Sequence, residues 1–485
     1  MSIIKIEGLS FAYPGSADNV FENLNLQLDS DWRLGFVGRN GRGKTTLLRL
    51  LMGELEYSGR ISSNLEFDYF PCQVNNSNRS TLEILRERSG GEDWQLSREF
   101  SRLAMEDELL DRPFASLSQG EQTKAMLAAL FINQDRFMLI DEPTNHLDGE
   151  ARRLVAKWLA GKKSYILVSH DRSFLDGCVD HILSLNRTGA EIQRGNFSSY
   201  LENFQRQQDF EFEQRSKLQK DIRRMEQAAG RTAQWSDRVE ASKKGAADKG
   251  YVGHKAAKMM KRSKAIEARQ QSAMEQKSRL LKNYESADEL KLRPLDYRSR
   301  LLAEFRDVTV SYDGRQVCRP VSFTLEQGER IALSGGNGSG KSSLLKLLFE
   351  NPPEHSGTVV LGSGLVISCV PQTAEGLGGS MSGFAKARGI DESLFKAVLD
   401  KMGVSRNQFE KDIAELSAGQ KKKLLLAGSL CQQAHLYVWD EPLNYIDIYS
   451  RMQIQSLIER FAPSMLFVEH DRAFRDSIAT REIRL

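Results

Sequence analysis

The chain has 485 residues, of which 40% are hydrophobic and 27% charged, and its 68 Lys and Arg residues nearly balance its 65 Asp and Glu residues. This composition is typical of a soluble globular protein of about two to four domains and excludes a disordered or fibrous chain. The five cysteines form no C-x-x-C pair, which argues against a disulfide framework, a zinc ribbon or an iron–sulfur cluster. No signal-peptide core follows Met1 and no uncharged stretch is continuous enough to span a bilayer, so we expect a cytoplasmic protein without a membrane domain.

Strand-like segments follow one another in the same order in the two halves of the chain. Ile3 to Phe11 alternates as a strand does, and short apolar runs follow at Leu34 to Val37 and Phe137 to Ile140. The corresponding runs of the second half are 303–311, 331–333 and 436–439. Short apolar runs flanked by glycine-rich turns predict strands buried on both faces of a largely parallel sheet, so we expect two α/β domains.

The segment from 200 to 299 differs in composition, because Lys, Arg, Glu, Gln and Ala dominate it, as in long helices. Apolar residues at helical spacing in two runs, at about 201–229 and 254–284, predict an antiparallel helix pair, and glycines mark its tip near 230–253. We therefore expect domains at 1–199 and 300–485, joined by a long antiparallel α-helical hairpin linker at 200–299.

Four short motifs recur at offsets of 297 to 300 residues, which indicates a tandem duplication. They are a glycine-rich loop at 38–45 and 335–342, Leu-Ser-x-Gly at 117–120 and 416–419, Asp-Glu-Pro at 141–143 and 440–442, and His-Asp-Arg at 170–172 and 470–472. Four motifs that recur in the same order at nearly the same offset are not expected by chance.

The glycine-rich loops have the pattern G-x-x-x-x-G-K-[ST] between a strand and a helix, which is typical of a phosphate-binding loop. Backbone N–H groups turn toward the phosphates, the Lys reaches the β- and γ-phosphates, and the following hydroxyl binds Mg²⁺. The ATP-binding residues expected here are Gly38, Asn40, Gly41, Gly43, Lys44, Thr45 and Thr46 in the first copy, and Gly335, Asn337, Gly338, Gly340, Lys341, Ser342 and Ser343 in the second.

Paired carboxylates stand at the ends of two buried strands. Asp141 and Asp440 can hold Mg²⁺ or its waters, and Glu142 and Glu441, which follow directly, would face the attacking water. A surface Asp-Glu pair is the alternative for one isolated copy, but a phosphate loop about 100 residues upstream in both copies favours catalysis.

The Leu-Ser-x-Gly element followed by Glu or Gln resembles the signature of the ATP-binding cassette (ABC) superfamily. The resemblance implies two tandem ABC-type P-loop ATPase domains that close head to tail around two ATP molecules, converting ATP and water to ADP and phosphate. It also implies roles for residues of each copy: adenine stacking by Tyr13 and Tyr312, signature contacts to the opposite ATP by Ser118, Gly120, Ser417 and Gly419, and catalytic γ-phosphate switches at His170 and His470.

The same resemblance implies a Mg²⁺ site in each copy, formed by Thr45, Asp141 and Gln73 in the first and by Ser342, Asp440 and Gln372 in the second. Gln372 follows Val370-Pro371 directly, as in the family. Gln73 stands one place later, after Phe70-Pro71-Cys72, so the two sites are expected to differ.

Fused cassettes with a long linker resemble the ABC-F group, which acts on the ribosome. Residues 201–300 hold 24 Lys or Arg and 15 Asp or Glu, so the linker is basic and the rest of the chain slightly acidic. Concentrated positive charge is what phosphate-backbone binding requires, and a solvated helix face is the alternative. The expected RNA-binding residues are Lys243, Lys244, Lys249, Tyr251, Lys255, Lys258, Lys261, Arg262 and Lys264.

Within ABC-F, the sequences at 38–44, 440–445 and 260–264 resemble the antibiotic-resistance (ribosomal protection) branch, and particularly the Lsa-type proteins. The resemblance implies a monomer whose ATP-closed form binds the tRNA exit site of the bacterial ribosome. Its linker would approach large-subunit rRNA near the peptidyl-transferase centre and the P-site tRNA, dislodging lincosamides, pleuromutilins or streptogramin A. A housekeeping ABC-F translation factor and the ATPase subunit of a drug exporter remain alternatives.

Overall fold

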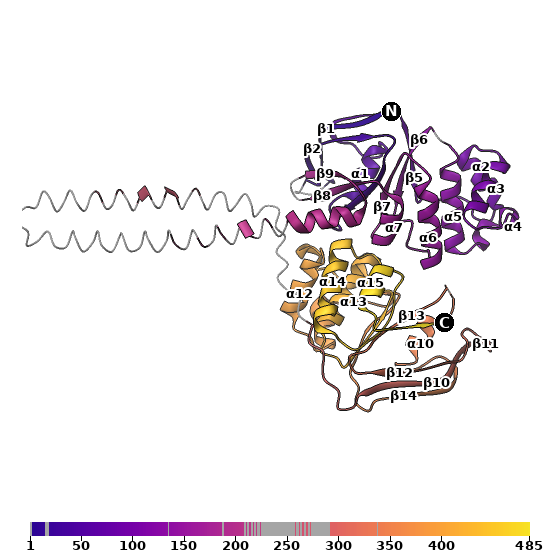
Figure 1. Ribbon diagram of the computed structural model, residues 1–485, viewed down its shortest axis with the longest axis vertical. Helices are drawn as coiled ribbons and strands as arrows, with labels where there is room; N and C mark the ends of the chain where they lie inside the picture. The colour runs from indigo at the N-terminus through magenta and orange to yellow at the C-terminus, as the bar shows by residue number, and fades with distance from the viewer. Residues whose placement is uncertain are drawn as a thin grey trace, which may run out of the picture. The chain divides into compact units, whose positions relative to one another are not determined.

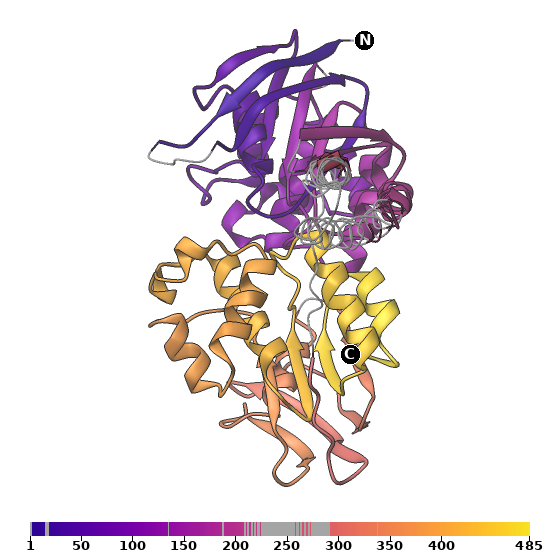
Figure 2. The same cartoon turned by 90° about the vertical axis from the view of Figure 1, so that its left-hand side faces the viewer.

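A computed structural model describes residues 2–14, 19–133, 135–186, 189–207, 292–336 and 338–485, together with scattered helical positions between 210 and 272. The chain divides into two units, of which one holds Met1–Leu185, Ala190–Ser198 and Ala287–Leu485 and the other holds Asn186–Gly189 and Ser199–Ser286. The first unit contains both repeats, drawn from indigo to magenta and from orange to yellow (Figures 1 and 2).

The first repeat is built on a six-stranded sheet in the order β5-β6-β7-β3-β8-β9, in which β5, β6, β7, β3 and β8 are parallel. The apolar runs predicted at 34–37 and 137–140 are buried within β3 and β6, and every residue of β7, which lies between these two strands, is buried as well. The strands are β3 (Arg33–Gly38), β5 (Glu66–Phe70), β6 (Arg136–Asp141), β7 (Tyr165–Val168), β8 (His181–Asn186) and β9 (Gly189–Arg194).

An antiparallel sheet in the order β2-β1-β4 accompanies this parallel sheet, and the alternating strand predicted at the start of the chain is β1. Figure 1 shows α2, α3, α4 and α5 grouped on the side of the parallel sheet away from β1 and β2. The bounds are β1 (Ile3–Phe11), β2 (Phe21–Asp29), β4 (Ser58–Ser62), α1 (Lys44–Leu51), α2 (Thr81–Ser89), α3 (Asp93–Arg102), α4 (Glu108–Asp111), the 3₁₀ turn η1 (Phe114–Ser116), α5 (Gln119–Leu130), α6 (Gly149–Ala160) and α7 (Arg172–Cys178).

The second repeat has the same plan, with a parallel sheet in the order β15-β16-β17-β13-β18 and an antiparallel sheet in which β10 pairs with β11, β12 and β14. Its strands are β10 (Leu301–Tyr312), β11 (Arg315–Gln316), β12 (Val321–Glu326), β13 (Arg330–Ser334), β14 (His355–Leu361), β15 (Ile367–Val370), β16 (Leu436–Asp440), β17 (Met465–Val468) and β18 (Arg481–Arg484). Its helices are α10 (Lys341–Lys346), α11 (Met381–Ala387), α12 (Glu392–Lys401), α13 (Ala418–Cys431), α14 (Ile448–Phe461) and α15 (Arg472–Ile478), with 3₁₀ turns η3 (Arg406–Gln408) and η4 (Ile413–Glu415).

The predicted buried strands are therefore confirmed in both repeats, and each ends beside a functional motif. β3 and β13 lead into the glycine-rich loops, and β6 and β16 end at the Asp of Asp-Glu-Pro. Because the carboxyl ends of parallel strands meet at one edge of a sheet, this topology brings loop and carboxylates together in each repeat.

From Ser199 onward, the described positions of the second unit are helical, and they include Lys258, Lys261 and Lys264. The antiparallel pairing and the tip near 230–253 lie outside the described residues. Of the helices in the described part of the chain, none combines the length and the apolar character needed to cross a membrane.

Candidate ATP-binding and hydrolysis sites

The first glycine-rich loop joins β3 to α1, and Gly43 is the residue at the turn into the helix. Its φ of 90° lies in the left-handed region, and an added Cβ would come within 2.6 Å of Val20 and 2.8 Å of Phe21. Only glycine allows this approach, which leaves the first N–H groups of α1 directed toward the loop. Gly340 has the same geometry before α10, with φ 87°.

Lys44 is buried at the start of α1, and its ammonium donates to the carbonyl oxygens of Gly38 at 2.7 Å and Arg39 at 3.4 Å. Burial lowers the pKa of Lys44, and the carboxylates of Glu142, Asp447 and Asp141 oppose that decrease. A phosphate group would supply the anionic partner that this buried cation requires.

Asp141, at the end of β6, accepts hydrogen bonds on Oδ2 from the Thr45 hydroxyl at 2.7 Å and from the Tyr69 hydroxyl at 3.2 Å. Burial raises the pKa of Asp141. A hydroxyl and a carboxylate side by side are a donor set that Mg²⁺ uses when phosphates supply further oxygens.

Glu142 follows Asp141 and adopts a left-handed backbone with φ 50°, as Glu441 does in the second repeat with φ 46°. Such strain in a non-glycine residue persists where the surrounding structure holds it, and it gathers at functional sites. His170 Nε2 lies 3.2 Å from Glu142 Oε1. Burial and the negative charge of Asp141 raise the pKa of Glu142 to about 8, and burial lowers the pKa of His170 well below its usual value.

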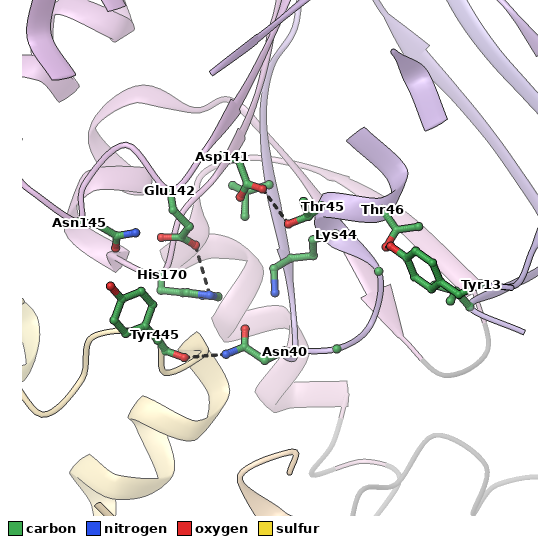
Figure 3. Close-up of a pocket in the computed structure, with 14 residues that line it drawn as sticks. Tyr13, Asn40, Lys44, Thr45, Thr46, Asp141, Glu142, Asn145, His170 and Tyr445 are labelled. Atoms are coloured by element: carbon green, nitrogen blue, oxygen red, sulfur yellow. Dashed lines mark hydrogen bonds and ion pairs between the residues drawn. The ribbon is translucent and has the colours of Figure 1, made fainter. Parts of the chain in front are cut away.

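These side chains line one cavity of about 390 Å³ (Figure 3). Tyr13 stands at its edge with 42% of its surface exposed, and its hydroxyl shares a 2.9 Å hydrogen bond with Thr46. An exposed ring beside a phosphate loop is placed for stacking on a base. The cavity is lined by Tyr13, Val20, Asn40, Gly41, Gly43, Lys44, Thr45, Thr46, Asp141, Glu142, Asn145, Val168, His170 and Tyr445.

Tyr445 brings the second repeat into this first cavity. The Asn40 side-chain amide donates to the Tyr445 carbonyl oxygen at 2.7 Å, and a Cβ at Gly419 would lie 3.1 Å from the Tyr445 Cβ (Figure 3). The signature segment of the second repeat thus adjoins a residue that lines the first site. A further contact between the repeats joins Arg172 to Gln455 at 2.6 Å.

The two signature serines begin helices in the same way. Ser118 caps α5 and Ser417 caps α13, and in each case the side chain three positions later accepts a hydrogen bond from the serine N–H. This capping box fixes the start of each signature helix.

Buried ion pairs hold the segment after each switch histidine. Arg152 lies 3.0 Å from Asp171, and Arg451 lies 3.2 Å from Asp471. Both arginines also donate to backbone carbonyls just after the Asp-Glu-Pro motif. The histidine segment and the carboxylate segment of each repeat are thereby tied together.

In the second repeat, Lys341 donates to the carbonyl oxygens of Gly335 at 3.0 Å and Gly336 at 2.8 Å, as Lys44 does in the first. The Tyr312 hydroxyl donates to Ser343 at 3.2 Å, which mirrors Tyr13 and Thr46. Asn337 lies outside the described residues, and Gly338 has a left-handed φ of 78°.

Asp440 is buried at the end of β16, and its Oδ1 has no hydrogen-bond partner within the described ranges. Burial raises the pKa of Asp440, and a hydrogen bond from Ser342 opposes the increase. An unpartnered buried carboxylate oxygen beside a hydroxyl fits a bound cation.

Glu441 is held more firmly than Glu142. Its Oε1 lies 3.3 Å from His470 Nε2 and accepts from the Gln372 amide at 3.2 Å, and its Oε2 accepts from the Asn444 amide at 2.8 Å. Burial alone would raise the pKa of Glu441, but His470 and the two amides lower it to about 2. The two candidate bases therefore lie in different environments.

Gln73 does not join the first cavity, because the extra Cys72 displaces it by one position and leaves it exposed. Tyr69 is the neighbour that reaches Asp141 instead, and Cys369 holds the equivalent position in the second repeat. A metal contact from Gln73 stays a prediction.

Sequence reasoning also missed Tyr445 and Asn145 as lining residues. The one available signal for Tyr445 was the difference between the copies, which have Asn-His at 145–146 and Asn-Tyr at 444–445.

Lys258, Lys261 and Lys264 are exposed on helical backbone. The other linker candidates, Lys243, Lys244, Lys249, Tyr251, Lys255 and Arg262, lie outside the described residues.

Comparison with known proteins agrees with this geometry. Residues 21–145 and 318–444 match the family described as ABC transporter, and together they cover just over half of the chain. The chain therefore belongs to the ATP-binding cassette (ABC) family, and it is an ATP-binding, ATP-hydrolysing enzyme of the ABC type.

Two relatives match nearly the whole chain. The ribosome protection protein VmlR of Bacillus subtilis is 26% identical over 97% of this chain and 85% of its own length. The energy-dependent translational throttle protein EttA of Escherichia coli K12 is 25% identical over 95% of this chain and 88% of its own length. These relatives support the ABC-F group, whereas the Lsa-type branch stays a prediction.

Among solved structures, an archaeal ribosome recycling factor, aABCE1, in complex with the ribosomal stalk protein aP1, has the same tandem fold. Its TM-score is 0.65 at 19% identity, and the match covers 98% of this chain and 87% of that chain.

Replacing Tyr13 by Ala is expected to weaken ATP binding at the first site about fivefold to 150-fold, because stacking of one base on an aromatic ring contributes about 1–3 kcal/mol. The measurement is an equilibrium titration with a fluorescent ATP analogue in a Lys341→Ala background, which weakens the second site. Tyr13→Phe keeps the ring and should bind within about twofold of the parent. Equal affinity of the Ala and Phe variants would contradict the stacking role.

Proposed function

We propose that this protein is an ABC-F ATPase of the ribosomal protection branch, which binds the bacterial ribosome and releases antibiotics from the peptidyl-transferase region. The observation that carries the proposal is the concentration of positive charge in 201–300 of a twin ATPase whose two cassettes are otherwise slightly acidic. RNA is the polyanion that such a segment binds. The relation to VmlR over 97% of the chain supports the same choice.

ATP is proposed to hold the two cassettes closed, since the first site draws its lining from both. Lys44 and the N–H groups of α1 bind the phosphates, and Tyr13 holds the base. Ser417 and Gly419 complete that site from the second cassette, and Ser118 and Gly120 act in the same way on the second site. Hydrolysis would remove the γ-phosphate contact and reopen the protein.

Glu142 and Glu441 are the proposed bases for the attacking water, with His170 and His470 orienting them. Mg²⁺ would be held by Thr45 and Asp141 in the first site. In the second site, Mg²⁺ would be held by Ser342, Asp440 and Gln372. In both sites the ion would neutralise charge on the phosphates. Among the residues described, no cluster of three His, Cys, Asp or Glu side chains could hold a metal, which fits a cation bound mainly through phosphate and water.

The closed form is proposed to occupy the tRNA exit site, with the linker directed toward large-subunit rRNA and the P-site tRNA. Lincosamides, pleuromutilins and streptogramin A are the expected drugs. The relation to EttA favours a second candidate, a translation factor that binds ribosomes and leaves drug sensitivity unchanged. Either protein would be cytoplasmic, ribosome-associated and monomeric.

The proposal predicts that purified protein with ATP restores cell-free bacterial translation stalled by a lincosamide. The measurement is reporter synthesis over a series of drug concentrations in an extract freed of membranes, which removes any contribution from export. The Lys44→Ala, Lys341→Ala double variant, which lacks both phosphate-binding lysines, is the control and should give no recovery. Intact ribosome binding without recovery by the parent protein would favour the translation factor.

The Glu142→Gln, Glu441→Gln double variant is expected to hydrolyse ATP at least about 100-fold more slowly than the parent, because a missing general base costs about 10²–10⁴ in rate. The variant should therefore stay on ribosomes. Sedimentation of ribosomes through sucrose with ATP measures the trapped fraction. Glu108→Gln with Glu410→Gln changes one exposed glutamate in each cassette and should behave as the parent. A trapping variant that sediments free of ribosomes would refute ribosome binding in the closed form.

A further inference from the structure

Lys422 is a buried cation in the middle of α13, with 2% of its surface exposed. Its ammonium donates to three backbone carbonyl oxygens, those of Pro371 at 2.7 Å, Gln372 at 3.2 Å and Asp440 at 2.9 Å. An ammonium has three donors, so these contacts use all of them. Lys422 therefore joins the loop after β15 to the end of β16.

The loop that Lys422 holds carries a group of the second catalytic site. The Gln372 side-chain amide donates to Glu441 Oε1 at 3.2 Å, and Glu441 follows Asp440 directly. Both ends of that amide–carboxylate contact are thus fixed by backbone that hydrogen-bonds to one ammonium. Removing the ammonium would leave three carbonyl oxygens without this donor and release the loop.

The first cassette lacks this arrangement. Thr123 stands in the position of Lys422, and its hydroxyl bonds within its own helix, to Gln119 O at 2.9 Å. Ser169 likewise stands in the position of Glu469, a buried carboxylate whose charge acts on Lys422. The cation and its compensating anion are therefore both present in one copy and both replaced by hydroxyls in the other.

We propose that Lys422 is a positioning residue of the second ATP site, which holds the Gln372 amide against Glu441 and makes hydrolysis there depend on the placement of α13. Since α13 begins at Ser417, which serves the first site, one helix links the signature of one site to the catalytic loop of the other. The first cassette has no equivalent link through Thr123. The inference rests on the proposed roles of Gln372, Glu441 and Ser417.

Lys422→Met keeps the length of the side chain and removes its charge and donors. In full-length protein with Glu142→Gln, where only the second site turns over, kcat should fall about tenfold or more, because displaced catalytic groups cost up to about 100-fold. KM for ATP should stay within about twofold, since Lys341 and Tyr312 do not contact Lys422. In the Glu441→Gln background, where the first site turns over, kcat should stay within about twofold.

A purely structural role gives a different pattern. If Lys422→Met only disrupted α13, turnover would fall in both backgrounds, because Ser417 begins the same helix, and that result would overturn the proposal. Lys421→Met is the matched control, since among the described residues the neighbouring Lys421 ammonium donates to Ala414 O alone, at 2.8 Å, and its loss should leave turnover in both backgrounds unchanged.

A double-mutant cycle gives a second test. Gln372→Ala, at an exposed position, should reduce second-site kcat as Lys422→Met does, and the two changes together should cost no more than either alone. Losses that multiply in the double variant would also overturn the proposal. The assay contains no ribosomes, so its outcome leaves ribosome protection to be decided separately.

Discussion

One constraint organises the structure, which is that the charged groups of the first candidate phosphate site lie in a cavity that residues of both cassettes line. Lys44, Asp141 and Glu142 come from the first cassette, whereas Tyr445 adds part of the wall from the second and accepts a hydrogen bond from Asn40. Charges enclosed in this way are stable only with partners of opposite sign. A nucleotide with its cation would supply them, and we propose that its binding at this site acts on the contact between the cassettes.

The duplication preserved the phosphate loops and diversified the surroundings of the two proposed catalytic carboxylates. Both sites place a lysine on loop carbonyls and a tyrosine hydroxyl on the helix that follows. Around Glu441, two amides and a histidine stabilise the charged carboxylate, whereas burial beside Asp141 favours the protonated form of Glu142. Two sites that carry out the same reaction in unequal environments are suited to hydrolysing ATP at different steps of the ATPase cycle.

Sequence reasoning succeeded where chemistry is local in the chain. A phosphate loop and a strand-terminal carboxylate pair each lie within a few consecutive residues, and the apolar strand before each of them fixes its place in the fold. It could not find Tyr445 or Lys422, because their partners lie far along the chain and meet only after packing. It included Gln73 in the first Mg²⁺ site by alignment with Gln372, with the one-position shift already visible at Cys72, and this metal contact stays a prediction.

The most direct test of a site shared between the cassettes compares two equivalent serines. Ser417→Ala and Ser118→Ala each remove one helix cap, at a cost of about 1 kcal/mol, so their structural effects are matched. With Glu441→Gln present, only the first site hydrolyses ATP. The account predicts that steady-state turnover then falls about tenfold or more with Ser417→Ala, through loss of a donor to the nucleotide, and changes little with Ser118→Ala. Loss of turnover with Ser118→Ala and its retention with Ser417→Ala would contradict the account.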